Sequence, residues 1–110
     1  MTTVAFFKNG NYFTGFKCTG HTGFAESGSD ILCASISAIT QSAAMGLMQV
    51  LGLKCEYKTN NKKGSLECWL PSIEDKQTFS NAQVLLNTAY VALKDLESGY
   101  PSNIKVEVKN

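Results

Sequence analysis

The feature that most constrains the fold is a long segment, residues 30–51, that is apolar on more than one side when drawn as a helix. Ser29 is a favourable N-cap and Asp30 suits a first turn, so the pattern predicts a helix from about Asp30 to Leu51 with Gly52 as its C-terminal stop. Small Ala, Ser and Gly side chains fill the gaps between its large apolar residues. Such a helix is buried on more than one face. We therefore expect it to pack against a sheet and also against a second helix or another subunit.

Two predicted hairpins flank this helix. Residues 3–7 and 12–19 are rich in strand formers, and the Asn9-Gly10 pair between them is a strong tight-turn signal. After the helix, residues 53–59 and 65–70 alternate between apolar and polar side chains, which predicts two half-buried strands joined by a polar turn. Residues 104–109 alternate in the same way and predict a fifth strand.

A second helix is predicted between Pro71 and the last strand. Ser72 is its expected N-cap, with Asp75 three residues on as in a capping box, and Gly99 ends it. The order of elements is β-β-α-β-β-α-β. This order predicts an α+β fold, a two-layer sandwich in which two helices cover one side of a mostly antiparallel sheet. At 110 residues the chain is expected to form one domain, residues 1–110.

The charge balance is nearly neutral, with a formal net charge of +1. We therefore expect no global attraction to nucleic acid or to a membrane surface. Serines, Thr40 and two glutamines interrupt the apolar run of residues 31–51, so it is not expected to span a membrane. The N-terminal residues lack the basic-then-apolar layout of a signal peptide, and a cytoplasmic protein is expected.

Four cysteines stand at positions 18, 33, 55 and 68. In a cytoplasmic chain we do not expect them to form disulfides, and a single histidine without Cys-x-x-Cys spacing does not suggest a zinc site. Cys18, Cys55 and Cys68 fall in predicted strands, where a cysteine is usually a small buried apolar residue. Cys33 differs because it falls near the predicted start of a helix.

The pair with chemical potential is Cys33 and the only histidine, His21. If Ser29 is the N-cap, Cys33 is the fourth helical residue, where unpaired amides and the helix dipole favour a thiolate and can hold an oxyanion. An imidazole in reach can act as acid toward a leaving amine. Asp30 can orient His21 or simply cap the helix. A lone histidine in a loop is often a surface residue, and a lone helical cysteine is often a core residue, so the pattern alone leaves this open.

The motif around these residues resembles a known family. Gly20-His21 is followed by a Gly-containing loop and by Gly-Ser-Asp-Ile-Leu-Cys-Ala-Ser-Ile-Ser at residues 28–37. This is similar to the ribosomal-processing cysteine proteases called Prp, which show Gly-His, a loop, and then Gly-x-Asp-Ile-Val-Cys-Ala-Ala-Val-Ser. Leu32, Ser35 and Ile36 are mild departures, and Thr22 stands where a small residue is common. The resemblance spans essentially the whole chain.

The resemblance implies a cytoplasmic cysteine endopeptidase that removes the N-terminal extension of a large-subunit ribosomal protein. It implies cleavage after an apolar segment that ends in paired phenylalanines, with Cys33 as nucleophile, His21 as general acid and base, and Asp30 in a supporting role. It further implies a homodimer, no metal or organic cofactor, and a mobile loop at residues 22–28. An apolar groove must receive the phenylalanines. Candidates for its lining are Phe24, Met45, Met48 and Trp69, although residues of these types are more often core or interface residues.

Two alternatives stay open from the sequence. One is a non-enzymatic module that binds the ribosome or RNA through a basic hairpin carrying Lys54, Lys58, Lys62 and Lys63. The other is a thiol-redox or acyl-carrying protein that uses Cys33 alone. Such a protein works without His21 and cleaves no peptide.

Overall fold

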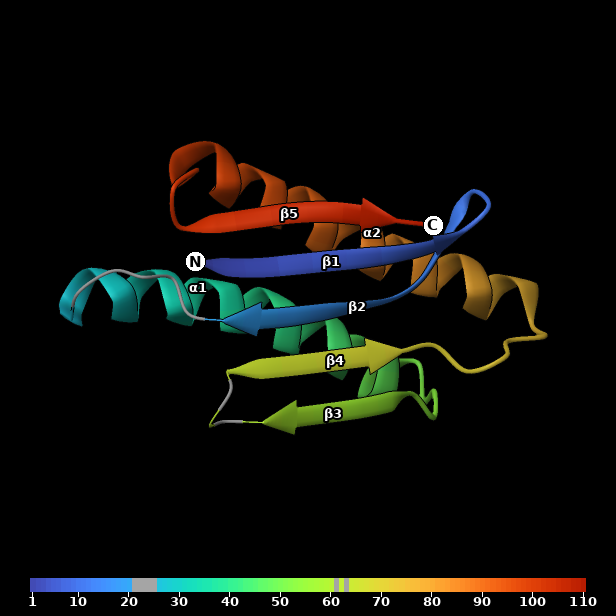
Figure 1. Ribbon diagram of the computed structural model, residues 1–110. Helices are drawn as coiled ribbons and strands as arrows, with labels where there is room; N and C mark the ends of the chain where they lie inside the picture. Colours follow the sequence, from blue (N-terminus) through green and yellow to red (C-terminus); the bar gives the residue numbers. More distant parts are fainter. Residues whose placement is uncertain (21–25, 61, 63) are drawn as a thin grey trace.

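The computed structural model describes residues 1–20, 26–60, 62 and 64–110, with the side chains of residues 26–30 excepted. The elements follow the predicted order (Figure 1). They are β1 (Thr2–Asn9), β2 (Tyr12–Gly20), α1 (Glu26–Met45) with a π-helical turn η1 (Gly46–Val50), β3 (Glu56–Asn60), β4 (Ser65–Trp69), α2 (Lys76–Gly99) and β5 (Ile104–Lys109).

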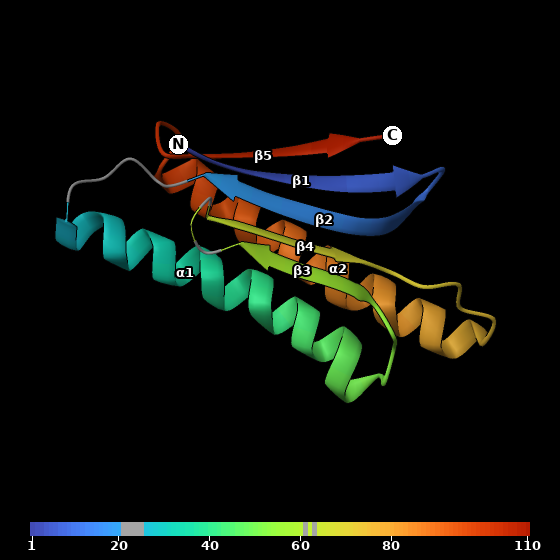
Figure 2. The ribbon, with the colours of Figure 1, turned by 60° about the horizontal axis from the view of Figure 1, so that its bottom comes forward.

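The five strands form one sheet with the spatial order β3-β4-β2-β1-β5. Every neighbouring pair is antiparallel except β1 and β5, which are parallel. Both helices lie on the same side of this sheet, as the two views in Figures 1 and 2 show. The predicted α+β two-layer sandwich with a mostly antiparallel sheet is therefore confirmed.

One hydrophobic cluster fills the space between the sheet and the helices. Phe6 and Phe16 contribute from the two central strands, Leu47 from the end of the first helix, and Leu86 and Leu93 from α2. All five are almost fully buried. Removing each such side chain from water stabilises the fold by about 1.5–3 kcal/mol, so this cluster is the main source of stability.

The predicted half-buried strand at residues 53–59 is partly wrong. Leu53 and Cys55 are half-buried against the core, but β3 begins only at Glu56, and all five of its residues are exposed. β3 is exposed because it is the terminal strand of the sheet. Alternating apolar residues become buried only where another element covers the strand.

Both helices start at residues other than those predicted. The first helix begins at Glu26, one turn before Asp30, because a favourable capping sequence does not prevent a helix from extending past it. The second is capped by Asp75 and not by Ser72, since the Asp75 carboxylate accepts the Thr78 N–H at 2.9 Å. The bonds from Thr78 hold the pKa of the Asp75 carboxyl below its usual value.

By length and composition alone, the segment Ile31–Val50 is the one helix in the described part of the chain that could cross a membrane. The core helix of a soluble protein passes the same test. Only 33% of this apolar segment is buried inside the chain. The expectation that this segment does not span a membrane stays a prediction, and its exposed large apolar residues are Ile31, Met45 and Val50.

Two side chains of α2 fasten this helix to the sheet. The Gln83 amide bonds both backbone groups of Phe13: it accepts the Phe13 N–H at 2.8 Å and donates to the Phe13 carbonyl at 2.8 Å. Near the other end of α2, the Glu97 carboxylate accepts the Val106 N–H of β5 at 2.7 Å. A hydrogen bond from Lys94, followed by that amide, lowers the pKa of Glu97.

We predict that Gln83→Ala destabilises the protein by about 1–3 kcal/mol, because it leaves two backbone groups beside the buried Phe13 ring without a partner. Urea unfolding followed by circular dichroism measures the change. Gln77→Ala is the matched control on the same helix, since the Gln77 amide is exposed and bonds only Asn81 within its own helix. Equal unfolding midpoints for the two variants would contradict the assignment.

Candidate active site

One open cavity of about 230 Å³ brings together the end of β2, the first half of α1 and the β3–β4 turn. Cys33 and Gly20 both line it, although they lie on different elements. The buried residues Cys18, Ile36 and Thr40 form its floor. The remaining lining residues are Thr2, Ser37, Gln41, Thr59, Asn60, Gly64, Ser65 and Leu66.

Cys33 is half-buried on the cavity side of α1. Because α1 begins at Glu26, Cys33 is the eighth helical residue and not the fourth. Unpaired amides and the strongest dipole effect belong to the first turn of a helix. The expectation that the N-terminal amides of this helix activate the Cys33 thiol and hold an oxyanion is therefore wrong.

Gly20 occupies a position that only glycine tolerates. Its φ is +90°, and a Cβ atom there would lie 2.6 Å from the Met1 carbonyl oxygen. Gly20 pairs with Thr2 at the end of the β1–β2 ladder, so the close approach to Met1 is part of the sheet itself. The last residue of β2 is thereby fixed at the cavity wall.

The predicted partners of Cys33 are described only in part. His21 and Phe24 lie outside the described residues, as does most of the predicted loop at residues 22–28. The Asp30 backbone is part of α1, three residues before Cys33, but its side chain is outside the description. The His21–Cys33 pairing thus stays a prediction.

The surroundings of the other three thiols raise their pKa values and so make them less reactive. Burial, together with the neighbouring Cys33, raises the pKa of Cys18 to about 11. Burial also raises the pKa of Cys68 to about 12, and it raises that of Cys55. The prediction that these cysteines are small buried residues in strands is confirmed for Cys18 and Cys68, whereas Cys55 is only half-buried and precedes β3. Cys18 is in addition a floor residue of the Cys33 cavity.

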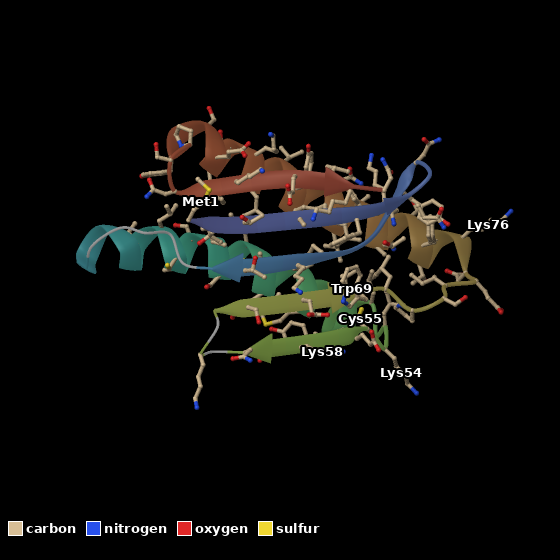
Figure 3. All side chains as sticks on the ribbon, viewed as in Figure 1. Met1, Lys54, Cys55, Lys58, Trp69 and Lys76 are labelled. Carbon is tan, nitrogen blue, oxygen red and sulfur yellow. The ribbon has the colours of Figure 1, made fainter. Side chains whose placement is uncertain are left out.

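The described candidates for an apolar groove do not line this cavity. Met45 and Met48 lie about three to four turns further along the helix. Trp69 lies on the other face of the sheet, with its ring centroid 4.8 Å from that of Phe7 and its indole N–H bonded to Glu67 at 2.8 Å (Figure 3). The apolar floor comes instead from residues that sequence reasoning treated as plain core.

Helical spacing alone could have found the lining residues of α1 that the sequence analysis missed, which are Ile36, Ser37, Thr40 and Gln41. Gln41 lies eight residues after Cys33 and therefore on the same side of the helix. Thr59, Asn60 and Leu66 carry no such signal, because only the pairing of distant strands brings them to Cys33. Among the described residues, no three His, Cys, Asp or Glu side chains gather closely enough to hold a metal ion.

We predict that iodoacetamide alkylates Cys33 at least about tenfold faster than the other three cysteines near pH 8, as measured by peptide mass spectrometry over time. The thiolate is the reactive form, and a pKa of about 11 in place of 9.0 lowers the Cys18 thiolate population there about 100-fold. Alkylation of Cys18 and Cys68 should keep increasing up to about pH 11–12. Equal rates at all four cysteines would remove Cys33 as the candidate nucleophile.

Comparisons with known proteins agree on one family. The family model of the cysteine protease Prp matches residues 1–105. The chain is 29% identical over 91 residues to the ribosomal processing cysteine protease Prp of Bacillus subtilis (strain 168), which covers 83% of this chain and 81% of that protein.

Solved structures share the fold. The S. aureus ribosomal processing protease Prp with a covalently linked product peptide has a TM-score of 0.85 at 24% identity, and with a substrate peptide 0.83 at 24% identity. Both matches cover 99% of this chain and 100% of the other. A Streptococcus mutans structure gives 0.84 at 18% identity, covering 99% and 94%. Since the family model spans nearly all 110 residues, this chain belongs to the cysteine protease Prp family.

Proposed function

We propose that this protein is an endopeptidase in which Cys33 is the nucleophile and His21 the general acid and base. The observation that carries the proposal is the cavity that Cys33 shares with Gly20. His21 follows Gly20 directly in the sequence, so the only imidazole of the chain is attached to a wall residue of the cavity. A cysteine with an imidazole in reach is an established arrangement for nucleophilic attack on a peptide.

In this mechanism the Cys33 thiolate attacks the carbonyl carbon of the scissile peptide bond. His21, protonated when it takes the thiol proton, donates that proton to the leaving amine as the C–N bond breaks. Water then hydrolyses the thioester and returns the enzyme. Asp30, one helical turn before Cys33, is proposed to support the site by orienting His21.

The proposed substrate is the N-terminal extension of a large-subunit ribosomal protein, cut after an apolar segment with paired phenylalanines. This class is supported by the Bacillus subtilis relative, a ribosomal processing cysteine protease, and by the S. aureus structures with a substrate and a product peptide. The apolar floor formed by Cys18 and Ile36 also suits a large apolar side chain next to the scissile bond. The proposal places the reaction in the cytoplasm, where ribosomal proteins are made.

We expect the native protein to cut the organism's own precursor ribosomal protein once, after the phenylalanines. Mass spectrometry of the products identifies the bond. Cys33→Ser should abolish cleavage, and His21→Ala should lower kcat/KM by at least about 100-fold, since general acid–base catalysis contributes about 10²–10⁴-fold.

Cys55→Ser is the matched control, because Cys55 is a half-buried thiol that does not line the cavity. It should keep nearly full activity. An intact, folded native protein that leaves the precursor uncut would sink the endopeptidase proposal. RNA binding by the exposed Lys54 and Lys58 (Figure 3) would then be the next test.

We further propose that the protein is a homodimer that buries the outer surface of its helix layer. Val84 and Val91 project from the same side of α2 and are 60% and 65% exposed. A neighbouring groove between the helices is lined by small and apolar residues, among them Ala38, Ile39 and Ala92. A second copy of this chain is the proposed occupant, because an apolar surface of this kind is stabilised by burial.

The double variant Val84→Glu/Val91→Glu should shift the protein from dimer to monomer in light scattering coupled to size exclusion. Four like charges would then face one another across the interface. Val50→Glu is the control, since Val50 is 81% exposed but lies in η1. It lines neither the groove between the helices nor the surface hollow of α2 that contains Val84 and Val91. A monomeric native protein, or a double variant that stays dimeric, would contradict this interface.

A further inference from the structure

We propose that Cys33 and Cys18 form a reversible oxidation site, in which a hydroperoxide oxidises Cys33 and the Cys18 thiol then closes a disulfide with it. The inference rests on the proposed function in one respect, because it takes Cys33 as the reactive thiol of the protease. It goes beyond that function by giving Cys18 the role of a resolving cysteine and by making the activity sensitive to oxidants.

The first observation is that the two thiols line one cavity. Cys33 lines it from α1, and Cys18 lines it from β2. Cys18 lies two residues before Gly20, and since the side chains of a strand alternate between its faces, both positions face the cavity. The other two cysteines, Cys55 and Cys68, do not line it. Cys18 is therefore the thiol that is placed to meet Cys33.

The second observation concerns the other side chains of the cavity. Among the described residues they carry hydroxyl, amide or aliphatic groups, such as those of Ser37, Gln41 and Ile36, and none is a thiol. A sulfenic acid is removed reversibly when it condenses with a thiol, whereas further oxidation to sulfinic or sulfonic acid is irreversible. Cys18 is thus the one described side chain of the cavity that can return an oxidised Cys33 to its active form.

The two thiols differ in the way that this order of reactions requires. Cys33 is half-buried at an open cavity, so a small hydroperoxide reaches it. Cys18 is buried on β2 between Val4 of β1 and Leu66 of β4. Burial, together with the neighbouring Cys33, raises the pKa of Cys18 to about 11, so its thiolate is scarce and the oxidant reacts first with Cys33. Once Cys33 is a neutral sulfenic acid, the like charge that disfavours the Cys18 thiolate is gone.

The reaction balances in two steps. The Cys33 thiolate attacks the O–O bond of hydrogen peroxide, takes one oxygen as a sulfenic acid and releases hydroxide. The Cys18 thiolate then attacks the Cys33 sulfur, and the S–S bond forms as the S–O bond breaks and hydroxide leaves. The protons of the two thiols convert both hydroxides to water, so the thiols are oxidised and the peroxide is reduced. A dithiol reverses the modification by thiol–disulfide exchange.

The disulfide also narrows the cavity. It holds its two Cα atoms about 4.4–6.8 Å apart, so α1 and β2 must approach each other across the space that separates them. β2 is paired on both sides, with β1 and with β4, and the movement therefore falls to α1. A disulfide that requires such a movement is strained, and strained disulfides are the readily reduced, regulatory ones. Oxidation thus blocks the nucleophile and closes its surroundings, and reduction restores both.

Peptide mapping of the oxidised native protein tests the disulfide without any activity measurement. Trypsin cuts after Lys17 and Lys54, so residues 18–54 form one peptide that contains Cys18, Cys33 and no other cysteine. After treatment with stoichiometric hydrogen peroxide, this peptide should lose the mass of two hydrogen atoms and resist iodoacetamide until dithiothreitol is added. Sulfinic acid on Cys33 beside an unmodified Cys18, or a disulfide from Cys33 to either of the other two cysteine peptides, would overturn the inference.

A variant of Cys18 tests whether the bond protects the enzyme. In the native protein, dithiothreitol should restore nearly all of the cleavage activity that peroxide removes. In Cys18→Ala, the recovered fraction of that variant's own initial activity should be at least about fivefold lower, because the Cys33 sulfenic acid is oxidised further. Cys55→Ala is the matched control and should recover as the native protein does, since Cys55 does not line the cavity. Equal recovery in Cys18→Ala and Cys55→Ala would remove Cys18 as the resolving cysteine.

Failure of the proposed function and failure of this inference give different results. A native protein that cleaves no precursor sinks the proposed function, while the peptide map still tests the disulfide. Dimedone, which traps sulfenic acids, gives a second readout that needs no cleavage. It should label Cys33 at least about fivefold more in Cys18→Ala than in the native protein, because the variant has no thiol to consume the sulfenic acid. Equal labelling of the two proteins would contradict the role of Cys18.

Discussion

The structure depends on the burial of one face of the sheet against two helices that lie on the same side. Phe6 and Phe16, from the paired central strands, project into this layer and contact each other, and Phe6 also contacts the aromatic rings of Phe13 and Tyr90. The opposite face has no second layer of helices in the described part of the chain (Figure 1). All of the large buried side chains therefore belong to a single interface, and the position of α1 and α2 over it determines where every other feature lies.

The cavity is a consequence of this arrangement at the end of the sheet where β2 stops. The β1–β2 register places Gly20 opposite Thr2, and the positive φ of Gly20 ends the strand at that point. The first half of α1 passes the same end of the sheet, and the start of β4 lies beside it through its pairing with β2. Three segments far apart in the sequence thereby surround Cys33. The strands β1 and β2, which supply part of these walls, also carry the buried core residues Val4, Phe6 and Phe16.

The uneven covering of the sheet also separates the surfaces of the protein by function. The groove between the two helices is lined by uncharged, mostly apolar residues such as Ala38, Ile39 and Ala92. The open face of the sheet carries mixed charges in contact with one another, such as Lys17 with Glu67 and Lys105 with Glu107. Pairs like these are solvated and contribute little to stability. The last residues of β3, Thr59 and Asn60, are exposed and line the cavity that contains Cys33.

The sequence by itself determined the element order, the α+β class and the family, because alternation, helical periodicity and turn residues act over a few positions and need no tertiary context. The Asn9-Gly10 turn and the stop at Gly99 are examples. It also selected Cys33 as the exceptional thiol, which the burial of Cys18 and Cys68 supports. The tertiary structure decided what depends on distant contacts: the first turn of α1, the exposure of β3, and the walls of the cavity. A helix start is a balance of weak local preferences, whereas exposure and cavity shape are set by which segments pack together, and no local pattern contains that information.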